Sequence, residues 1–214
     1  QHIESAGVHS GDSACVLPPY SISDDNLKEL RTHTHALAKA LNVVGLMNIQ
    51  FAIQDDNVYI IEVNPRASRT VPFVSKSIGV PLAKIAARAM VGRTLKEQGF
   101  TKEVHMKHIA VKEAVLPFNK FPGVDTVLGP EMKSTGEVMG IDNDPGLAFQ
   151  KAQLGAGVRL PQEGTVFVSV NDRDKEALIP IAQKLSDLNF KLIATRGTAA
   201  VLQKQNIPCE IILK

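Results

Sequence analysis

The sequence predicts an α/β protein in two parts, a mixed lobe of helices and antiparallel strands followed by the start of a smaller domain with a parallel sheet. Residues 47–64 have the pattern of a β-hairpin between helical segments, whereas residues 165–213 alternate between strands and helices. A stretch rich in Gly and Pro, 155–164, separates the two patterns and is interpreted as a linker. We therefore expect one domain at 1–154 and a second, truncated one at 165–214.

Helix and strand signals follow one another along the first domain. Ser23 and the two acids after it favour a helix start, and leucines at helical spacing continue to Asn42. Apolar and polar residues then alternate on both sides of Asp55-Asp56-Asn57, a turn-forming cluster. Pro81 to Val91 is a helix with Pro in its first turn. The remaining elements expected here are strands at 110–116 and 136–139 and a helix at 145–154.

The second domain has a regular order of elements. The expected strands are 165–170, 191–194 and 209–213, and the expected helices are 175–188 and 198–205. Alternating strands and helices favour right-handed βαβ units on a parallel sheet. About fifty residues are few for such a domain, which is why we expect it to be truncated.

Composition excludes several classes of protein. The chain has 214 residues, of which 44% are hydrophobic and 21% charged, as is typical of a globular protein. Its net charge of +2 gives no reason to expect binding to nucleic acid or to an anionic membrane, and no apolar run is long enough to span a bilayer. Two distant cysteines, Cys15 and Cys209, suit a cytoplasmic protein. Because the chain starts at Gln1 and stops within an apparent strand, we expect a fragment of a longer polypeptide.

One end of the expected hairpin carries several side chains with oxygen atoms. Symmetric pairing about the turn places Gln50 opposite Glu62, and Glu62 shares a strand face with Asn64. One carboxylate and two amide oxygens then gather on one patch, which suits Mg²⁺ when substrate phosphates complete its coordination. Arg66 follows at once, and its planar fork suits a phosphate oxygen. The alternative is an exposed hairpin face that is merely polar.

These hairpin residues resemble the metal and nucleotide end of an ATP-grasp domain. Four further stretches resemble, more narrowly, the large subunit of carbamoyl-phosphate synthetase. They are His2 to Cys15, Arg69 to Ser75, Pro117 to Val124 and Ser134 to Gly140. The resemblance covers essentially all 214 residues. It implies the second ATP-grasp half of that family, because only this half is followed directly by a methylglyoxal-synthase-like allosteric domain.

The resemblance implies a site for ATP and two Mg²⁺ or Mn²⁺ ions, with K⁺ as a further candidate ion. The residues that it assigns to ATP are Gly7, Val8, His9, Ser10, Gln50 and Glu62, and those that it assigns to the metal ions are Gln50, Glu62 and Asn64. Arg66 and Arg69 are the expected catalytic residues, because two guanidinium groups beside a metal site suit carbamate or a transferring phosphoryl group. The alternatives are a polar turn at 7–10 and a surface arginine at Arg69.

The resemblance also implies two effector sites. The first would hold the amine groups of ornithine with the acids Glu4, Asp12 and Glu113, although single acids are more often solvated surface groups. The second would hold the phosphate of a nucleoside monophosphate, and its expected residues are Lys175, Thr195, Thr198 and Lys214. A helix N-terminus directly after a strand favours such an anion. The alternative there is an ordinary helix cap by Thr.

The expected function is therefore that of the large chain of a glutamine-hydrolysing carbamoyl-phosphate synthase. Its ATP- and Mg-dependent step would phosphorylate carbamate to carbamoyl phosphate for pyrimidine and arginine synthesis. The expected partners are a glutamine amidotransferase small subunit and, as a further possibility, other copies of the same chain. We expect the isolated chain to be inactive, because it lacks the flexible phosphate loop. Another ATP-grasp ligase or carboxylase, and a purely regulatory nucleotide-binding module, are the alternatives.

Overall fold

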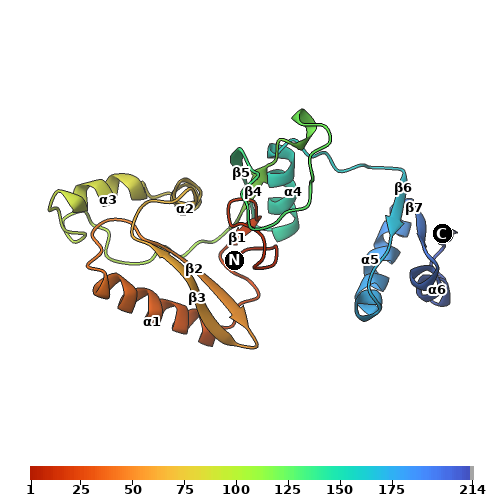
Figure 1. The fold of residues 1–214 in the computed structure, drawn as a ribbon, viewed down its shortest axis with the longest axis horizontal. Helices are drawn as coiled ribbons and strands as arrows, with labels where there is room; N and C mark the ends of the chain where they lie inside the picture. The colour runs from red at the N-terminus through yellow and green to blue at the C-terminus, as the bar shows by residue number, and fades with distance from the viewer. Residues whose placement is uncertain (213–214) are drawn as a thin grey trace. The chain divides into compact units, whose positions relative to one another are not determined.

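A computed structural model describes residues 1–212 of this chain. They form two compact units, one ending at Val158 and the other beginning at Arg159 (Figure 1). The elements of the first unit are β1 (Cys15–Leu17), α1 (Asp24–Ala40), β2 (Asn48–Gln54), β3 (Asn57–Asn64), α2 (Thr70–Ile78), α3 (Leu82–Met90), β4 (Ile109–Val115), the short 3₁₀ helix η1 (Phe118–Lys120), β5 (Gly136–Asp142) and α4 (Pro145–Gly155).

The first unit contains two separate antiparallel sheets. One is the hairpin of β2 and β3, and the other has the strand order β1-β4-β5. Asp55 and Asp56 close the hairpin with φ angles of 50° and 61°, and positive φ at both central residues matches the twist of the flanking strands. Helix α1 contacts β3 and begins at the N-cap Ser23, whose hydroxyl accepts a hydrogen bond from the Asn26 N–H.

Helix α4 packs against strands β4 and β5 of the three-stranded sheet. Its alanines Ala148 and Ala152 are completely buried at this contact. Gly140 of β5 allows the close approach, because a Cβ atom at this position would lie 2.1 Å from the carbonyl oxygen of Ala148. Small residues on both sides therefore bring the helix unusually close to the sheet.

The second unit is built on a parallel sheet with strand order β6-β7-β8. Its elements are β6 (Thr165–Val168), the short 3₁₀ helix η2 (Asp172–Asp174), α5 (Lys175–Asp187), β7 (Lys191–Thr195), α6 (Arg196–Lys204) and β8 (Glu210–Ile212). Its core consists of Val168, Leu178, Ala182, Leu192, Ala194, Ala199, Leu202 and Ile207. Both helices contact the central strand β7 and cover its apolar side chains.

The predicted fold class is confirmed, because a mixed unit with antiparallel strands precedes a unit with a parallel sheet. Several details differ from the sequence-based expectations. Helix α2 and strand β1 were not predicted, strand β5 continues to Asp142 instead of ending at Met139, and α6 begins at Arg196, two residues earlier than expected. Strand β1 forms because it pairs with β4, and β5 extends to Asp142 because that residue pairs with Ile109 of β4.

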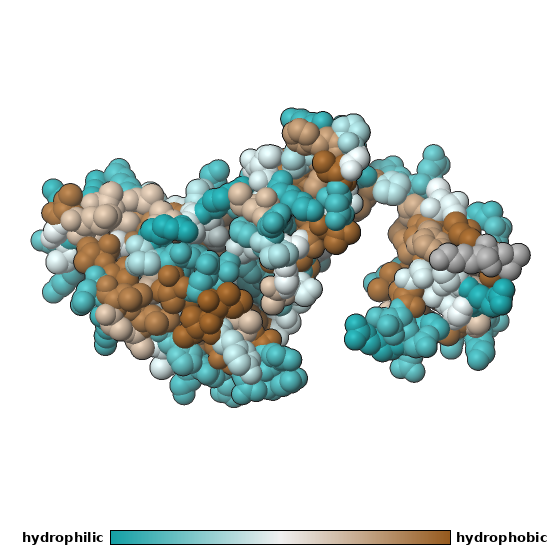
Figure 2. Space-filling model, in the orientation of Figure 1, coloured by the Kyte–Doolittle hydropathy of each residue, from teal (hydrophilic) through white to brown (hydrophobic). Residues whose placement is uncertain are grey.

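Within residues 1–212, none of the helices combines the length and the apolar character required to cross a bilayer. The first unit nevertheless exposes apolar side chains over the β2–β3 hairpin, as Figure 2 shows. Tyr59, Ile60 and Ile61 of β3 are between 44% and 55% exposed. One part of the hairpin therefore presents apolar area that the described residues leave uncovered.

Candidate functional site

The open end of the hairpin carries the residues that predict a metal site. Strand register pairs Gln50 with Glu62, as the sequence predicts, and also pairs Asn48 with Asn64. Because cross-strand partners share a sheet face, these four polar side chains lie on one face. The register shifts between Gln50 and Phe51, so a β-bulge adjoins the patch.

Glu62, Asn64 and Arg66 form a line of hydrogen bonds at this end. The Asn64 amide nitrogen donates to Glu62 Oε1 at 2.9 Å, and Arg66 Nη2 lies 3.5 Å from Asn64 Oδ1. Arg66 Nη1 donates to the carbonyl of Ala67 at 2.9 Å. A cation bound by both Glu62 and Asn64 requires the Asn64 amide to turn its oxygen toward Glu62, which is a rotation about one bond.

The donors at this end of the hairpin fit a hard divalent cation. Gln50, Glu62 and a rotated Asn64 offer oxygen atoms from one sheet face, which is the ligand chemistry that Mg²⁺ and Mn²⁺ prefer. Only one of the three is a carboxylate. In keeping with this, the described residues contain no group of three or more His, Cys, Asp or Glu side chains that could hold a metal ion.

The loop between residues 5 and 13 is folded back on itself by backbone hydrogen bonds. The Val8 N–H donates to Ser5 O at 3.0 Å, and the His9 N–H donates to Gly129 O at 2.8 Å, far away in the sequence. The Gly11 N–H donates to His9 Nδ1 at 3.0 Å, which leaves Nε2 as the protonated nitrogen of a neutral ring. Gly7 lies exposed at the tip.

Several of the residues assigned to ATP line one cavity. This cavity of the first unit has a volume of about 600 Å³, and Val8, Ser10 and Gln50 lie in its wall together with Glu4. The structure therefore brings the loop and the hairpin to one concave surface, although they are forty residues apart in the sequence. Glu62 lies on the same hairpin but is not among the residues that line the cavity.

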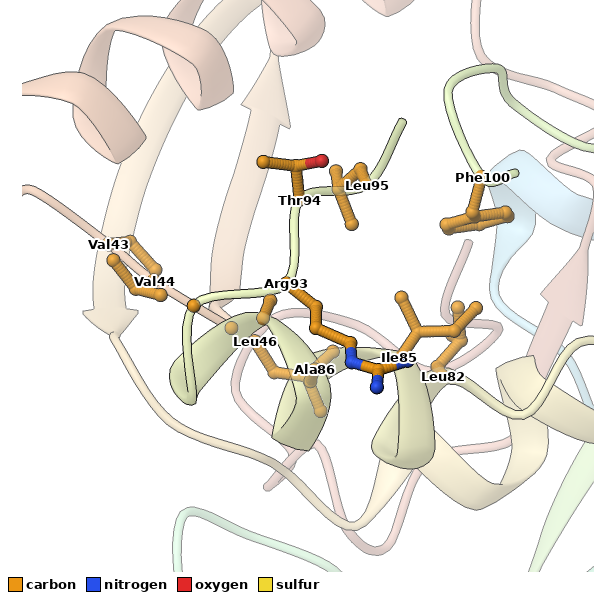
Figure 3. A pocket seen from close by; sticks show the side chains of 13 residues that line it. Val43, Val44, Leu46, Leu82, Ile85, Ala86, Arg93, Thr94, Leu95 and Phe100 are labelled. Carbon is orange, nitrogen blue, oxygen red and sulfur yellow. The ribbon is translucent and has the colours of Figure 1, made fainter. Parts of the chain in front are cut away.

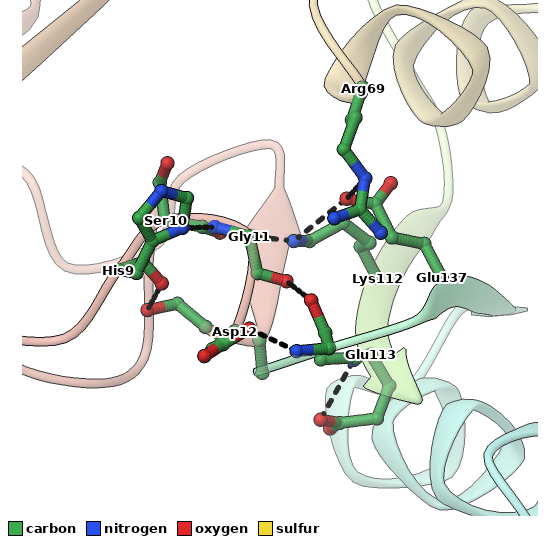
Figure 4. Close-up of polar contacts among 12 residues, drawn as sticks. His9, Ser10, Gly11, Asp12, Arg69, Lys112, Glu113 and Glu137 are labelled. Carbon is green, nitrogen blue, oxygen red and sulfur yellow. Dashed lines mark hydrogen bonds and ion pairs between the residues drawn. The ribbon is translucent and has the colours of Figure 1, made fainter. Parts of the chain in front are cut away.

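Asp12, one of the acids assigned to ornithine, anchors the loop from within (Figure 4). It is only 1% exposed, and its two oxygens accept the N–H groups of Lys133 at 2.7 Å and Ser134 at 2.8 Å. Burial raises the pKa of Asp12, but these donors outweigh it and hold the pKa below its usual value. Any ligand amine at Asp12 must share a carboxylate that already accepts two hydrogen bonds.

Glu4 lies near enough to Glu113 for its negative charge to act on that carboxyl group. Glu4 Oε2 accepts the Ala14 N–H at 2.7 Å, and Glu113 Oε2 accepts from Gln153 Nε2 at 2.6 Å. Burial raises the pKa of Glu113, and the negative charge of Glu4 raises it further. Two neighbouring carboxylates, one of them buried, are suited to a cationic ligand.

Arg69 and Arg66 have different partners. Arg69 directly precedes helix α2, and its Nε lies 3.8 Å from Glu137 Oε1 on strand β5. The same oxygen lies 3.6 Å from the ammonium of Lys112, which also donates to Ser10 O at 3.3 Å (Figure 4). Arg69 is thus connected through Glu137 and Lys112 to the loop that contains Ser10.

The second unit gathers three of the four residues assigned to the effector phosphate. Thr195 Oγ1 lies 3.3 Å from Thr198 Oγ1 and 3.3 Å from Ser169 Oγ. The Lys175 ammonium approaches the first turn of α6, because a Cβ atom added to Gly197 would lie 3.1 Å from it. The fourth residue, Lys214, lies outside the residues that the structure describes.

Two features of this cluster bear on anion binding. No side chain caps the N-terminus of α6, so its first N–H groups keep their capacity for a ligand. The Lys175 ammonium is bound 2.5 Å from Asp172 Oδ1, and this contact lowers the pKa of Asp172. A phosphate would therefore compete with a carboxylate for Lys175.

A second cavity, of about 420 Å³, lies beside helix α3 (Figure 3). Its wall is mainly apolar and includes Val43, Leu82, Ile85 and Phe100, with Arg93 as its one charged lining residue. The sequence-predicted site residues are absent from this wall. The cavity is therefore separate from the candidate site.

Three polar residues of these clusters were missed by sequence reasoning. Asn48 is paired with Asn64, a position that symmetric extension of the predicted hairpin could have found. Lys112 and Glu137 stand in strands that are otherwise mainly apolar, and a charged residue within such a strand is a usable signal. Their mutual contact was not predictable, because it depends on the register of β4 and β5.

Comparisons with known families point in one direction. The profile described as "Carbamoyl-phosphate synthase L chain, ATP binding domain" matches residues 3–98, and the profile described as "MGS-like domain" matches residues 177–214. The first covers the candidate nucleotide loop and the hairpin. The second covers most of the second unit.

Curated relatives match along the whole chain. The carbamoyl phosphate synthase large chain of Synechocystis sp. is 63% identical over 215 residues, that of Nostoc sp. 62% over 219 residues and that of Archaeoglobus fulgidus 59% over 215 residues. Each alignment covers 100% of this chain but 20% of the relative. The chain thus spans about a fifth of the length of the curated relatives it matches.

Among solved structures, the ADP complex of N5-carboxyaminoimidazole ribonucleotide synthetase is similar to this chain. The TM-score is 0.50 at 16% sequence identity, over 66% of this chain and 40% of that one. At this level of identity the likeness concerns the fold alone.

Proposed function

Because the chain belongs to the family of carbamoyl-phosphate synthase large chains, we propose that residues 1–154 are part of an ATP-grasp domain that phosphorylates carbamate. The observation that carries this proposal is the hairpin end, where Gln50 and Glu62 are paired and Asn64 and Arg66 adjoin them. The product would be carbamoyl phosphate, a precursor for pyrimidine and arginine synthesis.

In this proposal the hairpin residues hold the charges of ATP in place. Gln50, Glu62 and Asn64 would hold Mg²⁺ or Mn²⁺, which when bound neutralises the β- and γ-phosphates. Arg66 would contact the γ-phosphoryl group as it moves, and its present contact with Asn64 keeps it beside the metal ligands. Arg69 would contact the same group or the carbamate.

No protein nucleophile is needed for this transfer. An oxygen of carbamate attacks the γ-phosphorus of ATP, the bond from that phosphorus to the β-bridging oxygen breaks, and ADP leaves with the electron pair. The chain's contribution is therefore to orient the phosphates and stabilise their charge. Ser10, Val8 and Gln50, which share one cavity wall, would position the nucleoside part.

The second unit would be an effector domain. Lys175, Thr195 and Thr198 would bind the phosphate of a nucleoside monophosphate at the first turn of α6. Glu4 and Glu113 would bind the amines of ornithine, with Asp12 fixing the loop between them and contributing charge. The small glutamine amidotransferase subunit would supply ammonia to the full-length protein.

Glu62 provides the sharpest test of this proposal. In the full-length enzyme, Glu62→Gln should lower the rate of ATP synthesis from ADP and carbamoyl phosphate on the order of 10²-fold or more, since charge stabilisation of this kind has that magnitude. Glu103→Gln is the matched control, because Glu103 is an exposed acid of the same unit that pairs with Arg31. A rate near that of the parent for Glu62→Gln would show that the metal assignment is wrong.

The complete reaction should need more of the protein than these residues. The chain spans about a fifth of its relatives, and the described residues supply one wall of a nucleotide site. We therefore expect no carbamoyl phosphate synthesis by the 214-residue chain alone.

A further inference from the structure

Lys112 is a buried cation that joins two parts of the candidate site. We propose that Lys112 is a positioning residue, which fixes the loop at Ser10 and, through Glu137, the guanidinium of Arg69. The inference rests on the proposed function, because it adds Lys112 to the machinery that orients the transferring phosphoryl group.

Burial shows that Lys112 is costly to the fold. It is 2% exposed on strand β4, and its neighbours Ala110 and Val111 are buried as well. Removing an ammonium from water is costly unless partners compensate, and apolar residues of similar volume often replace such buried ion pairs without loss of stability. The stability of the sheet therefore does not explain why a lysine occupies this position.

The contacts of Lys112 supply that reason. Its ammonium donates to Ser10 O at 3.3 Å, and this carbonyl belongs to the loop assigned to ATP. The ammonium also lies 3.6 Å from Glu137 Oε1, which is the oxygen that Arg69 Nε approaches to 3.8 Å. One lysine thereby connects the nucleotide loop with a candidate catalytic arginine.

The charges of this cluster explain how the connection works. A single carboxylate, Glu137, is shared by two cations, so its position depends on both of them. Without Lys112 the carboxylate is free to turn fully to Arg69 and form a closer pair. Arg69 would then be drawn toward β5, and part of its charge would be lost to the phosphoryl group.

The test uses the full-length enzyme and the synthesis of ATP from ADP and carbamoyl phosphate. Lys112→Met should lower kcat about 10- to 100-fold, the range expected for misplacing a catalytic group by about 1 Å, and should raise the KM for ADP because Ser10 loses its anchor. Lys112→Arg, which keeps the charge, should restore part of kcat. Lys191→Met, which removes an exposed lysine paired with Glu210, should leave both parameters unchanged.

A second set of variants separates positioning from folding. Because Lys112 acts through Arg69, Lys112→Met should cost much less in an Arg69→Lys background than in the parent. Glu137→Gln breaks the same connection without altering Lys112 and should also lower kcat, which keeps the proposal testable if Lys112→Met does not fold.

Three results would overturn the inference. Unchanged kcat in Lys112→Met or in Glu137→Gln, while Arg69→Lys is impaired, would show that the connection does not position Arg69. Full additivity of Lys112→Met with Arg69→Lys would show that Lys112 acts elsewhere. Normal activity of Arg69→Lys would instead remove Arg69 from the proposed function, and the inference with it.

Discussion

Replacing Gly140 by alanine should destabilise the first unit severely. The added Cβ would lie 2.1 Å from Ala148 O and 2.6 Å from Ala152 N, and both are backbone atoms that cannot swing away. Relief requires α4 to move from β5 by about 1 Å, which opens a contact between completely buried alanines. Overpacking typically costs 1–3 kcal/mol, and a backbone clash belongs at or above the upper end, so we expect about 3 kcal/mol or more.

The assay is thermal unfolding of the chain, with hydrogen exchange of the α4 amides to report on this contact. For a unit of this size, about 3 kcal/mol corresponds to a fall in Tm of roughly 6–12 °C. Gly136→Ala is the matched control on the same strand, because its Cβ would meet only the Val115 side chain, whose Cβ and Cγ2 lie at an ordinary 3.7 Å and 3.8 Å. If Gly140→Ala had the same Tm as Gly136→Ala, and hydrogen exchange in α4 were unchanged, the close approach of helix and sheet would be refuted.

Two further predictions concern the loop anchor and the effector cluster. Asp12→Ala should destabilise the first unit by about 2–4 kcal/mol at pH 7, because a buried N–H donor and a partly buried one lose a charged acceptor. The pKa of Asp12 is lowered in the folded state. Its contribution to the free energy of unfolding is therefore present above the unfolded pKa of about 4 and is lost as the pH falls through the folded pKa. Urea titrations in which the parent remains more stable than the variant in strong acid would contradict this. In the full-length enzyme, Thr198→Ala should weaken the response to a nucleoside monophosphate several-fold, since allosteric coupling is typically about 1–3 kcal/mol, and should leave turnover without effector unchanged. Thr165→Ala, on the exposed start of β6, should change neither the response nor the turnover.

Elements with strong local signals were predictable from the sequence. The hairpin follows from alternation around Asp55 and Asp56, which tolerate the positive φ of a tight turn. The register set by this two-residue turn would pair Gln50 with Ile61, and the bulge between Gln50 and Phe51 moves its partner to Glu62. The sequence-based pairing of Gln50 with Glu62 is therefore right, but the turn alone does not produce it. The parallel sheet of the second unit was predictable for a similar reason, because its strands and helices alternate with short connections.

Features that depend on long-range packing could not be predicted. Strand β1 has three residues and exists because it pairs with β4, almost a hundred residues later. The β-bulge beside Gln50 has no local signal, although it affects where the patch points. The partners of Asp12 follow it by more than 120 residues, so a reading of the loop alone could not show that Asp12 anchors the loop.

Because long-range packing positions the loop and Arg69, the candidate site also depends on residues that do not face a ligand. Asp12 connects the candidate nucleotide loop to the segment that leads into β5, and Lys112 connects it to β4. Both strands in turn pack against α4, where Gly140 admits the close contact. A disturbance of that contact should therefore reach the loop and Arg69 as well as the core. If so, Gly140→Ala in the full-length enzyme should lower turnover at temperatures well below its unfolding transition, which connects the packing of this sheet to the chemistry proposed for the hairpin.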